Sequence, residues 1–96
     1  MILLKLLSLR EMYGYEIMSN LRERSSREFL FKDGTLYPVL YRLEHAGHVE
    51  THWKTQDRGV PRKYYRITPS GRRQLKASVQ EWHAFAASVS NFLDTD

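Results

Sequence analysis

The fold is decided by the stretch Asp33-Gly-Thr-Leu-Tyr-Pro-Val-Leu-Tyr-Arg-Leu-Glu-His-Ala-Gly47, a short amphipathic segment that two strand-like runs follow at once. At 3.6 residues per turn, its apolar residues fall on one side of a helix and its polar residues on the others. The apolar side consists of Leu36, Val39, Leu40, Leu43 and Ala46. The other sides carry Tyr37, Pro38, Tyr41, Arg42 and His45. A helix of this size fits the DNA major groove, where such groups can contact base edges and phosphates.

Residues that start and stop helices flank this segment. Asp33 and Thr35 can both accept hydrogen bonds from the free amides of a first turn. We favour Thr35 as the cap, because Pro38 then lies in the first turn, where its missing N–H costs nothing. Gly47 tolerates a positive φ and closes the helix. The sequence therefore predicts a helix that starts near Thr35 and ends before Gly47.

Two runs after Gly47 alternate in side-chain character, as strands do. The first extends from His48 to Trp53 and the second from Arg62 to Ile67. The segment between them, from Lys54 to Pro61, contains Gly, Pro and Asp and is too long for a two-residue turn. A helix followed by two strands around a projecting loop is the order of a winged helix-turn-helix, with the loop as the wing.

Two shorter helices are predicted before the deciding stretch. The first, from Ile2 to Leu9, is apolar nearly all round, as buried helices are. Residues Arg10 to Gly14 form a turn. The second helix extends from Tyr15 to about Arg24. Its apolar face is formed by Ile17, Met18 and Leu21. Phe29 to Phe31 then supply an apolar connector to the third helix.

The C-terminal segment carries a second strong pattern. Thr68 is a suitable helix cap, and Pro69 suits the first helical position. Apolar residues then recur at alternating steps of four and three, which is the spacing of a coiled-coil seam. The seam comprises Leu75, Val79, Trp82, Ala86, Val89 and Leu93, broadened by Phe85 and Phe92. It either joins two chains in a two-fold dimer or lets the helix fold back on its own domain, and we favour the dimer.

Length and composition bound the class of protein. The 96 residues make one small domain, and domains of this size often gain stability from a partner. We expect a winged helix-turn-helix at residues 1–69 and a C-terminal dimerisation helix at residues 70–96, so the fold class is mostly α with a small β-hairpin. There is no cysteine and no apolar stretch of about 20 residues, which favours a cytoplasmic protein over a membrane protein.

Positive charge is concentrated in one segment. The chain has a net charge of +4, yet seven cations and one anion lie between Lys54 and Arg73, so the remainder is net negative. A basic segment beside an amphipathic helix is the electrostatic pattern of a phosphate-binding surface. The alternative is a solvated basic face without a partner.

The sequence lacks the common catalytic and metal-binding patterns. His48 and His52 share one face of a strand, but four strand residues span about 13 Å, which is too far for a shared metal. There is no glycine-rich phosphate loop, no Gly-x-Ser-x-Gly elbow and no His-Glu-x-x-His motif. We therefore expect neither an enzyme nor a metal or cofactor site.

Short motifs in a fixed order cover nearly the whole chain. They are Tyr13-Gly-Tyr-Glu-Ile17, then Gly34-Thr-Leu-Tyr-Pro38 with Arg42-Leu-Glu44 and Gly47, then Arg62-Lys-Tyr-Tyr-Arg-Ile-Thr68 with Gly71. Together they resemble the PadR family of bacterial transcriptional regulators. The resemblance implies a winged-helix DNA-binding domain that dimerises through its C-terminal helix, as in the short subfamily with a single such helix. It also implies a repressor that a small ligand or a stress signal releases from operator DNA.

The chain departs from the family at its start. Family members commonly carry additional residues before the segment that begins here at Ile2, and these belong to the first helix and often add to the dimer contact. Either the start is shorter than typical or the true start lies upstream of Met1.

The residues expected to contact DNA lie on the third helix and the wing. Tyr37 and Tyr41 are one helical turn apart and can hydrogen-bond phosphate or base edges, whereas Arg42 can pair with phosphate or guanine. The alternative for each tyrosine is half-burial in the core. Thr35 can present the amides of the helix start to a phosphate. The full expected set is Tyr15, Thr35, Tyr37, Pro38, Tyr41, Arg42, Arg58, Arg62 and Lys63. For Tyr15, packing is an equal alternative.

Two functions stay open on the sequence. The first is a homodimeric repressor on a pseudo-palindromic duplex operator, responsive to a small hydrophobic or aromatic effector. Trp82 in the seam would then lie near its own copy and could stack a flat ligand, although a seam tryptophan is more often plain core. The second is a winged-helix module for protein contact. The joint presence of a polar third helix and a cationic wing favours DNA.

Overall fold

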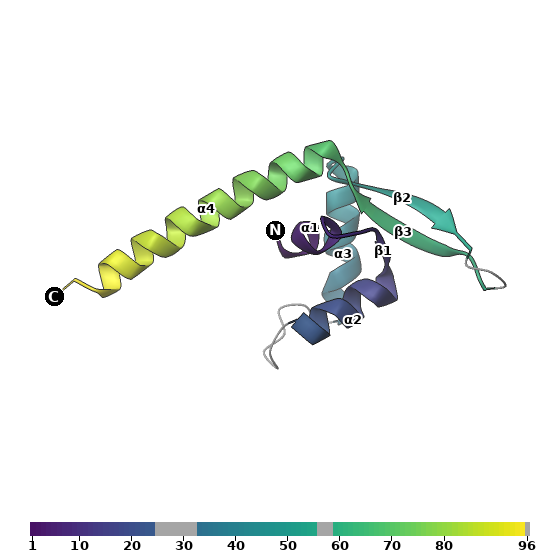
Figure 1. Cartoon of the computed structure of the whole chain (residues 1–96), viewed down its shortest axis with the longest axis horizontal. Coiled ribbons are helices and arrows are strands. Elements are labelled where there is room, and N and C mark those ends of the chain that lie inside the picture. The colour runs from purple at the N-terminus through teal and green to yellow at the C-terminus, as the bar shows by residue number, and fades with distance from the viewer. Residues whose placement is uncertain (25–32, 56–58, 96) are drawn as a thin grey trace.

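The computed structural model describes residues 1–24, 33–55 and 59–95, which contain four helices and three strands (Figure 1). The elements are α1 (Ile2–Leu7), β1 (Met12–Tyr13), α2 (Gly14–Arg24), α3 (Asp33–His45), β2 (Val49–Lys54), β3 (Arg62–Ile67) and α4 (Pro69–Leu93). The expected fold class, mostly α with a β-hairpin in a winged helix-turn-helix, is confirmed. Two expectations, the apolar connector Phe29 to Phe31 and the wing residue Arg58, lie outside the described residues.

The sheet has one strand more than the expected hairpin. β2 and β3 pair antiparallel as predicted, with Val49 opposite Ile67 and Lys54 opposite Arg62. On the other side of β3, β1 pairs through Met12 and Tyr13 with Tyr65 and Tyr64, so the strand order is β1-β3-β2. The expectation of a plain turn from Arg10 to Gly14 is therefore wrong. A two-residue strand carries no periodicity of its own, and only its partner in the fold defines it.

Three boundaries differ from the expected ones. α1 ends at Leu7 instead of Leu9, and Leu9 is exposed. α3 begins at Asp33, so Thr35 lies within its first turn instead of capping it, and Pro38 lies inside the helix. The apolar face of α3 ends at Leu43, because Ala46 follows the helix and is exposed.

The C-terminal end of α3 is closed as predicted by Gly47. This glycine has a φ of 80°, and its N–H donates to the carbonyl of Glu44 at 3.0 Å. The next N–H, that of His48, donates to the carbonyl of Leu43 at 2.9 Å. This pair of bonds is the Schellman arrangement, which satisfies the last carbonyls of a helix and requires a left-handed residue at the position of Gly47.

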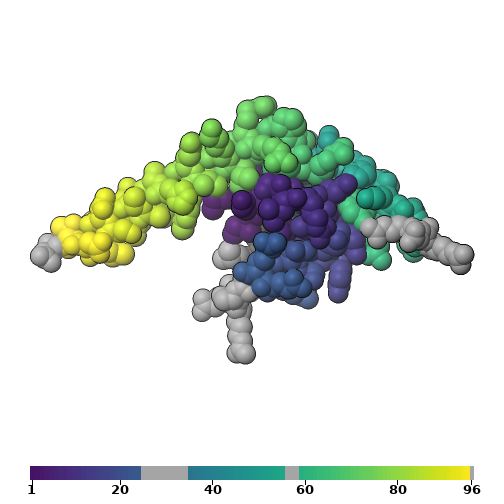
Figure 2. Space-filling model, viewed as in Figure 1, coloured from purple at the N-terminus to yellow at the C-terminus, as the bar shows by residue number. Residues whose placement is uncertain are grey.

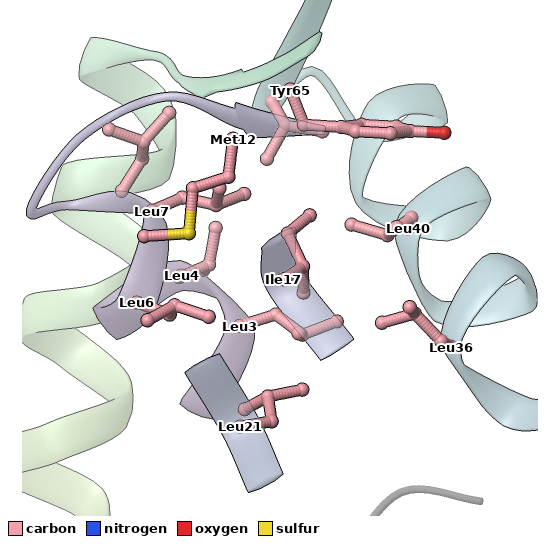
Figure 3. Close-up of a cluster of buried hydrophobic side chains, with 12 residues drawn as sticks. Leu3, Leu4, Leu6, Leu7, Met12, Ile17, Leu21, Leu36, Leu40 and Tyr65 are labelled. Atoms are coloured by element: carbon pink, nitrogen blue, oxygen red, sulfur yellow. The ribbon is translucent and has the colours of Figure 1, made fainter. Parts of the chain in front are cut away.

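The core lies where α1 is enclosed by the other elements (Figure 3). As predicted, α1 is buried nearly all round. Its leucines contribute to one cluster with apolar side chains of α2, α3 and the sheet. The cluster comprises Leu3, Leu4, Leu6, Leu7, Met12, Ile17, Leu21, Leu36, Leu40, Val49, Tyr65 and Ile67. Burying the inner faces of α2 and α3 in this way leaves their outer faces free to meet a partner.

α4 begins as predicted and then leaves the body of the molecule. Thr68 is the cap, and its Oγ1 accepts a hydrogen bond from the Gly71 N–H at 3.0 Å while Pro69 occupies the first turn. Figure 1 shows the helix extending away from the core, and the radius of gyration of 16.0 Å exceeds the roughly 12.5 Å of a compact chain of this length. The alternative in which α4 folds back on its own domain is not adopted. Of the helices in residues 1–24, 33–55 and 59–95, none has the length and apolarity needed to cross a bilayer.

Candidate nucleic-acid interface

The outer face of α3 carries the predicted aromatic hydroxyls. Tyr37 is 58% exposed and Tyr41 is 65% exposed, so neither is half-buried core. The ring of Tyr41 stacks on that of His45, with centroids 5.9 Å apart, and this contact stiffens an otherwise free side chain. Arg42, Thr35 and Pro38 are exposed on the same helix. The helix therefore presents hydroxyl, imidazole and guanidinium groups, which are the groups that contact bases and phosphates.

The start of α2 meets this face at Gly14. A β-carbon at Gly14 would clash with the hydroxyl oxygen of Tyr37, so only glycine lets that side chain lie against the start of α2. The next residue, Tyr15, is 72% exposed, which excludes the alternative that it packs in the core. Three tyrosines therefore line one hollow together with Gly14 where α2 meets α3, namely Tyr13, Tyr15 and Tyr37.

Gly14→Ala tests whether the position of Tyr37 matters for binding. The new methyl group displaces the Tyr37 hydroxyl, which lies at the far end of a movable side chain, so we expect little change in stability. If Tyr37 contacts DNA as predicted, affinity for duplex DNA should fall about fivefold, the typical value of one lost hydrogen bond. Fluorescence anisotropy with labelled duplex measures this. Tyr37→Phe should cause a similar loss, and the double variant should lose no more; full affinity in Gly14→Ala would exclude a role for this hydroxyl.

The three cations of β3, which follow the wing, differ in the groups that they contact. The guanidinium of Arg62 lies over the ring of Tyr13, 4.5 Å from the centroid, and is held at the surface by this contact. Lys63 Nζ lies 3.7 Å from a carboxylate oxygen of Glu44. Arg66 Nε lies 2.8 Å from a carboxylate oxygen of Glu50. Of these three cations, of which Arg62 and Lys63 were predicted to contact DNA, Arg62 is the one whose described contact is not with an acid.

A hollow of about 320 Å³ joins α2, α3 and the wing. Of the residues expected to contact DNA, the structure brings Tyr15, Tyr37, Arg62 and Lys63 together around it. Tyr41 and Arg42 lie beyond it, further along α3. Among the described residues that line it, none is acidic. The hollow combines hydroxyls, cations and aromatic rings, and this chemistry suits a sugar-phosphate backbone.

Five lining residues are not in the predicted contact set, namely Tyr13, Gly14, Trp53, Pro61 and Tyr65, and the two that stand out are Trp53 and Tyr13. Trp53 is 69% exposed at the end of β2, and Tyr13 lies in the unexpected strand β1. Trp53 pairs with Lys63 across the hairpin, so alternation along the two strands already placed it on the face of Lys63. That alternation was a usable signal. Tyr13 had none, because β1 was unpredicted.

The histidines have structural partners. His52 Nε2 lies 2.8 Å from a carboxylate oxygen of Glu11, which ties the segment before β1 to β2. The ring of His52 also stacks on Tyr64. His48 Nδ1 lies 3.1 Å from Ser70 Oγ, at the junction with α4. These contacts join the sheet to the segment before β1 and to the start of α4.

The predicted seam lies far from this surface. α4 and the hairpin extend from the body in opposite directions (Figure 2). Beyond Leu75, which packs on the core, the seam and its flanking aromatics are largely exposed, with Trp82 at 51% and Phe92 at 80%. Trp82 and Val79 line a second, mostly apolar hollow of about 540 Å³, together with Ile2, Leu6 and Leu9 near the first helix. The chain thus has one polar cationic surface and, separately, one apolar surface.

Comparison with known proteins agrees with this architecture. The sequence profile described as the transcriptional regulator PadR-like family matches residues 3–77. An uncharacterized protein of Lysinibacillus sphaericus is 36% identical over 93 residues, which cover 97% of this chain and 85% of that protein. A transcriptional regulator from Clostridium thermocellum has a TM-score of 0.86 at 33% identity, covering 97% of this chain and 90% of that chain. A PadR family transcription regulator from Clostridium difficile has a TM-score of 0.82 at 36% identity, with coverages of 94% and 92%.

Proposed function

This chain belongs to the PadR-like family of transcriptional regulators, and on that premise we propose that it is a homodimeric repressor that binds a pseudo-palindromic DNA operator in the cytoplasm and responds to a small ligand. The observation that carries the proposal is the hollow between α2, α3 and the wing, which gathers hydroxyl and cationic groups without a lining acid among the described residues. A protein-contact module would not need these groups converging beside an exposed helix face.

Each part of this surface has a distinct role in the proposal. Tyr37, Tyr41 and Arg42 on α3 enter the major groove, where hydroxyl and guanidinium groups read base edges. Arg62 and the wing contact the phosphate backbone and add salt-dependent affinity without sequence information. Tyr15 at the start of α2 contacts the adjacent phosphate.

The exposed seam supports dimerisation. A single extended helix with large apolar side chains facing water is unfavourable, and burying them against a second copy removes this cost. The proposed interface comprises Leu75, Val79, Trp82, Phe85, Ala86, Val89, Phe92 and Leu93. A two-fold dimer built this way places two copies of α3 on successive turns of one face of the duplex.

The apolar hollow beside Trp82 supports a ligand-responsive repressor. It lies between the first helix and α4, so a hydrophobic or aromatic molecule bound there touches both the body and the dimerisation helix. A ligand shifts a conformational equilibrium only by its differential affinity for the two states. A ligand that favours a different angle between body and α4 would separate the two copies of α3 and release the operator.

A salt series distinguishes DNA binding from protein contact. Sequencing DNA fragments that co-purify with the protein supplies a recovered duplex, and a scrambled duplex of equal composition serves as control. We expect affinity for both to fall with salt, and the preference for the recovered duplex to persist at about a thousandfold or more. Weak retention that is equal for the two duplexes at every salt concentration would instead favour the protein-contact module.

Arg62→Ala should weaken binding to all DNA by a similar factor. Its cation is held over Tyr13 and contributes phosphate contact, so its loss should reduce the slope of log affinity against log salt by about 0.9 for each contacting subunit. Arg66→Ala is the matched control, because Arg66 is paired with Glu50 and should leave the slope unchanged. Equal slopes in the wild-type protein and Arg62→Ala would remove Arg62 from the interface.

A further inference from the structure

Glu44 connects α3 to both long strands of the sheet. It lies one residue before the end of α3, and its side chain is only one third exposed. Thr51 Oγ1 of β2 donates a hydrogen bond to one carboxylate oxygen at 2.9 Å. Lys63 Nζ of β3 lies 3.7 Å from the other oxygen. One carboxylate oxygen of Glu44 therefore contacts β2 and the other contacts β3, the two strands that flank the wing.

Lys63 is held in place from a second side. Its ammonium lies over the ring of Tyr65, 5.6 Å from the centroid, so Lys63 contacts both Glu44 and an aromatic face while its side chain stays 39% exposed. Burial, followed by the nearby Tyr37 and Glu44, raises the pKa of the Tyr65 phenol, which therefore stays neutral. Because that phenol contributes no charge, Glu44 is the group that balances Lys63. Yet Lys63 also lines the hollow proposed to receive the DNA backbone.

We propose that Glu44 is a positioning residue that determines DNA specificity, holding Lys63 away from phosphate and fixing the wing against α3. The inference rests on the proposed function, since it assigns a role within the same DNA-binding surface. Glu44 itself does not contact DNA. It lowers the affinity for arbitrary duplex by neutralising one cation, and it thereby leaves discrimination to the groups on α3.

The physical reason is the different origin of the two kinds of affinity. Non-specific binding comes almost entirely from phosphate neutralisation, so each additional free cation strengthens binding to every sequence alike. Base recognition by Tyr37, Tyr41 and Arg42 requires α3 at a defined depth in the groove. By neutralising one cation, Glu44 lowers the non-specific affinity. By fixing the wing against α3, it favours base recognition. Both effects raise specificity.

Glu44→Gln removes the negative charge that pairs with Lys63 but keeps the hydrogen bond with Thr51. The amide oxygen of glutamine still accepts the Thr51 hydroxyl, but the side chain no longer pairs with Lys63. With a labelled duplex of arbitrary sequence, we expect the salt slope of the variant to be steeper than that of the wild-type protein by about 0.9 for each contacting subunit. Over a tenfold decrease in salt, the variant should therefore gain about eightfold more affinity than the wild-type protein for each contacting subunit. Thermal melting shows that the variant is folded.

Two further variants identify the group through which Glu44 acts. In a Lys63→Met background, Glu44→Gln should leave the salt slope unchanged, because the cation it would release is absent. Thr51→Val removes the hydrogen bond and keeps the ion pair, so its slope should equal that of the wild-type protein. An unchanged slope in Glu44→Gln, or an equal increase in the Lys63→Met background, would overturn the inference. If the wild-type protein bound no duplex, the proposed function would fail instead, so the two failures are distinguishable.

Discussion

Val89→Asp is expected to convert the proposed dimer into monomers and to weaken binding to the proposed operator by a factor of about 10² to 10⁴. Val89 lies in the seam of α4, and the substitution would place two carboxylates at the same apolar contact, one from each subunit. Charges of like sign in an apolar interface are strongly unfavourable. A monomer occupies one half-site only and loses the effective concentration that links the two. Analytical ultracentrifugation and anisotropy with a labelled operator measure both effects.

Ala87→Asp is the matched control for this prediction. Position 87 adds the same charge to the same exposed helix but lies on the side opposite Val89, at two residues or about 200° of rotation. It should remain dimeric and bind the operator with nearly full affinity. A Val89→Asp protein that sediments like the wild-type protein would contradict the assignment of the seam as the interface.

Gly71→Ala is expected to destabilise the fold by about 3 kcal/mol, through overpacking in a confined space. Gly71 is the buried residue of α4, in its first turn. A β-carbon there would clash with the backbone carbonyl oxygen of His48 and would lie 2.8 Å from Ile67 Cγ1. That carbonyl already accepts the N–H of Thr68 at 3.1 Å, so it cannot move without breaking the junction of α4 with the body. A domain of this size should then melt about 15 °C lower.

Gly47→Ala measures the cost of an unfavourable backbone conformation alone, because a side chain at this position has enough space. Gly47 has a φ of 80°, but a β-carbon there would meet no atom within 4 Å. Only the left-handed conformation is penalised, at about 1 kcal/mol, so the melting temperature should fall by about 5 °C. Melting is followed by circular dichroism at one protein concentration, because the proposed dimerisation would make the transition concentration-dependent. A smaller decrease for Gly71→Ala than for Gly47→Ala would contradict the packing at this junction.

Periodic and chemically distinctive segments could be predicted from the sequence. The apolar spacing of α3 around Leu36 and Leu40 identified its buried face, and Gly47 identified its end, because few other residues tolerate that φ. Thr68 and Pro69 similarly marked the start of α4. The exposure of Tyr37 and Tyr41 agrees with the same helical pattern, since a helix with one buried face presents its other residues outward.

Features that depend on distant partners could not be predicted in this way. β1 has two residues, and only pairing with Tyr64 and Tyr65 makes it a strand. Pro38 normally favours the start of a helix, yet here the helix begins five residues earlier. The contact of Glu44 with Thr51 and Lys63 joins three elements, so no local pattern contains it. β1 and the contacts of Glu44 both depend on residues that are distant in the sequence, which a local pattern does not contain.

Selection of binding sites from a pool of randomised duplexes tests the central claim most directly, that two copies of α3 and the wing read DNA together. The wild-type protein is incubated with the pool at moderate salt, and the retained duplexes are amplified and sequenced over several rounds. The account predicts enrichment of an inverted repeat whose half-site centres lie about one helical turn, or a multiple of it, apart. A retained pool that stays random, or an enriched site without two-fold symmetry, would contradict it.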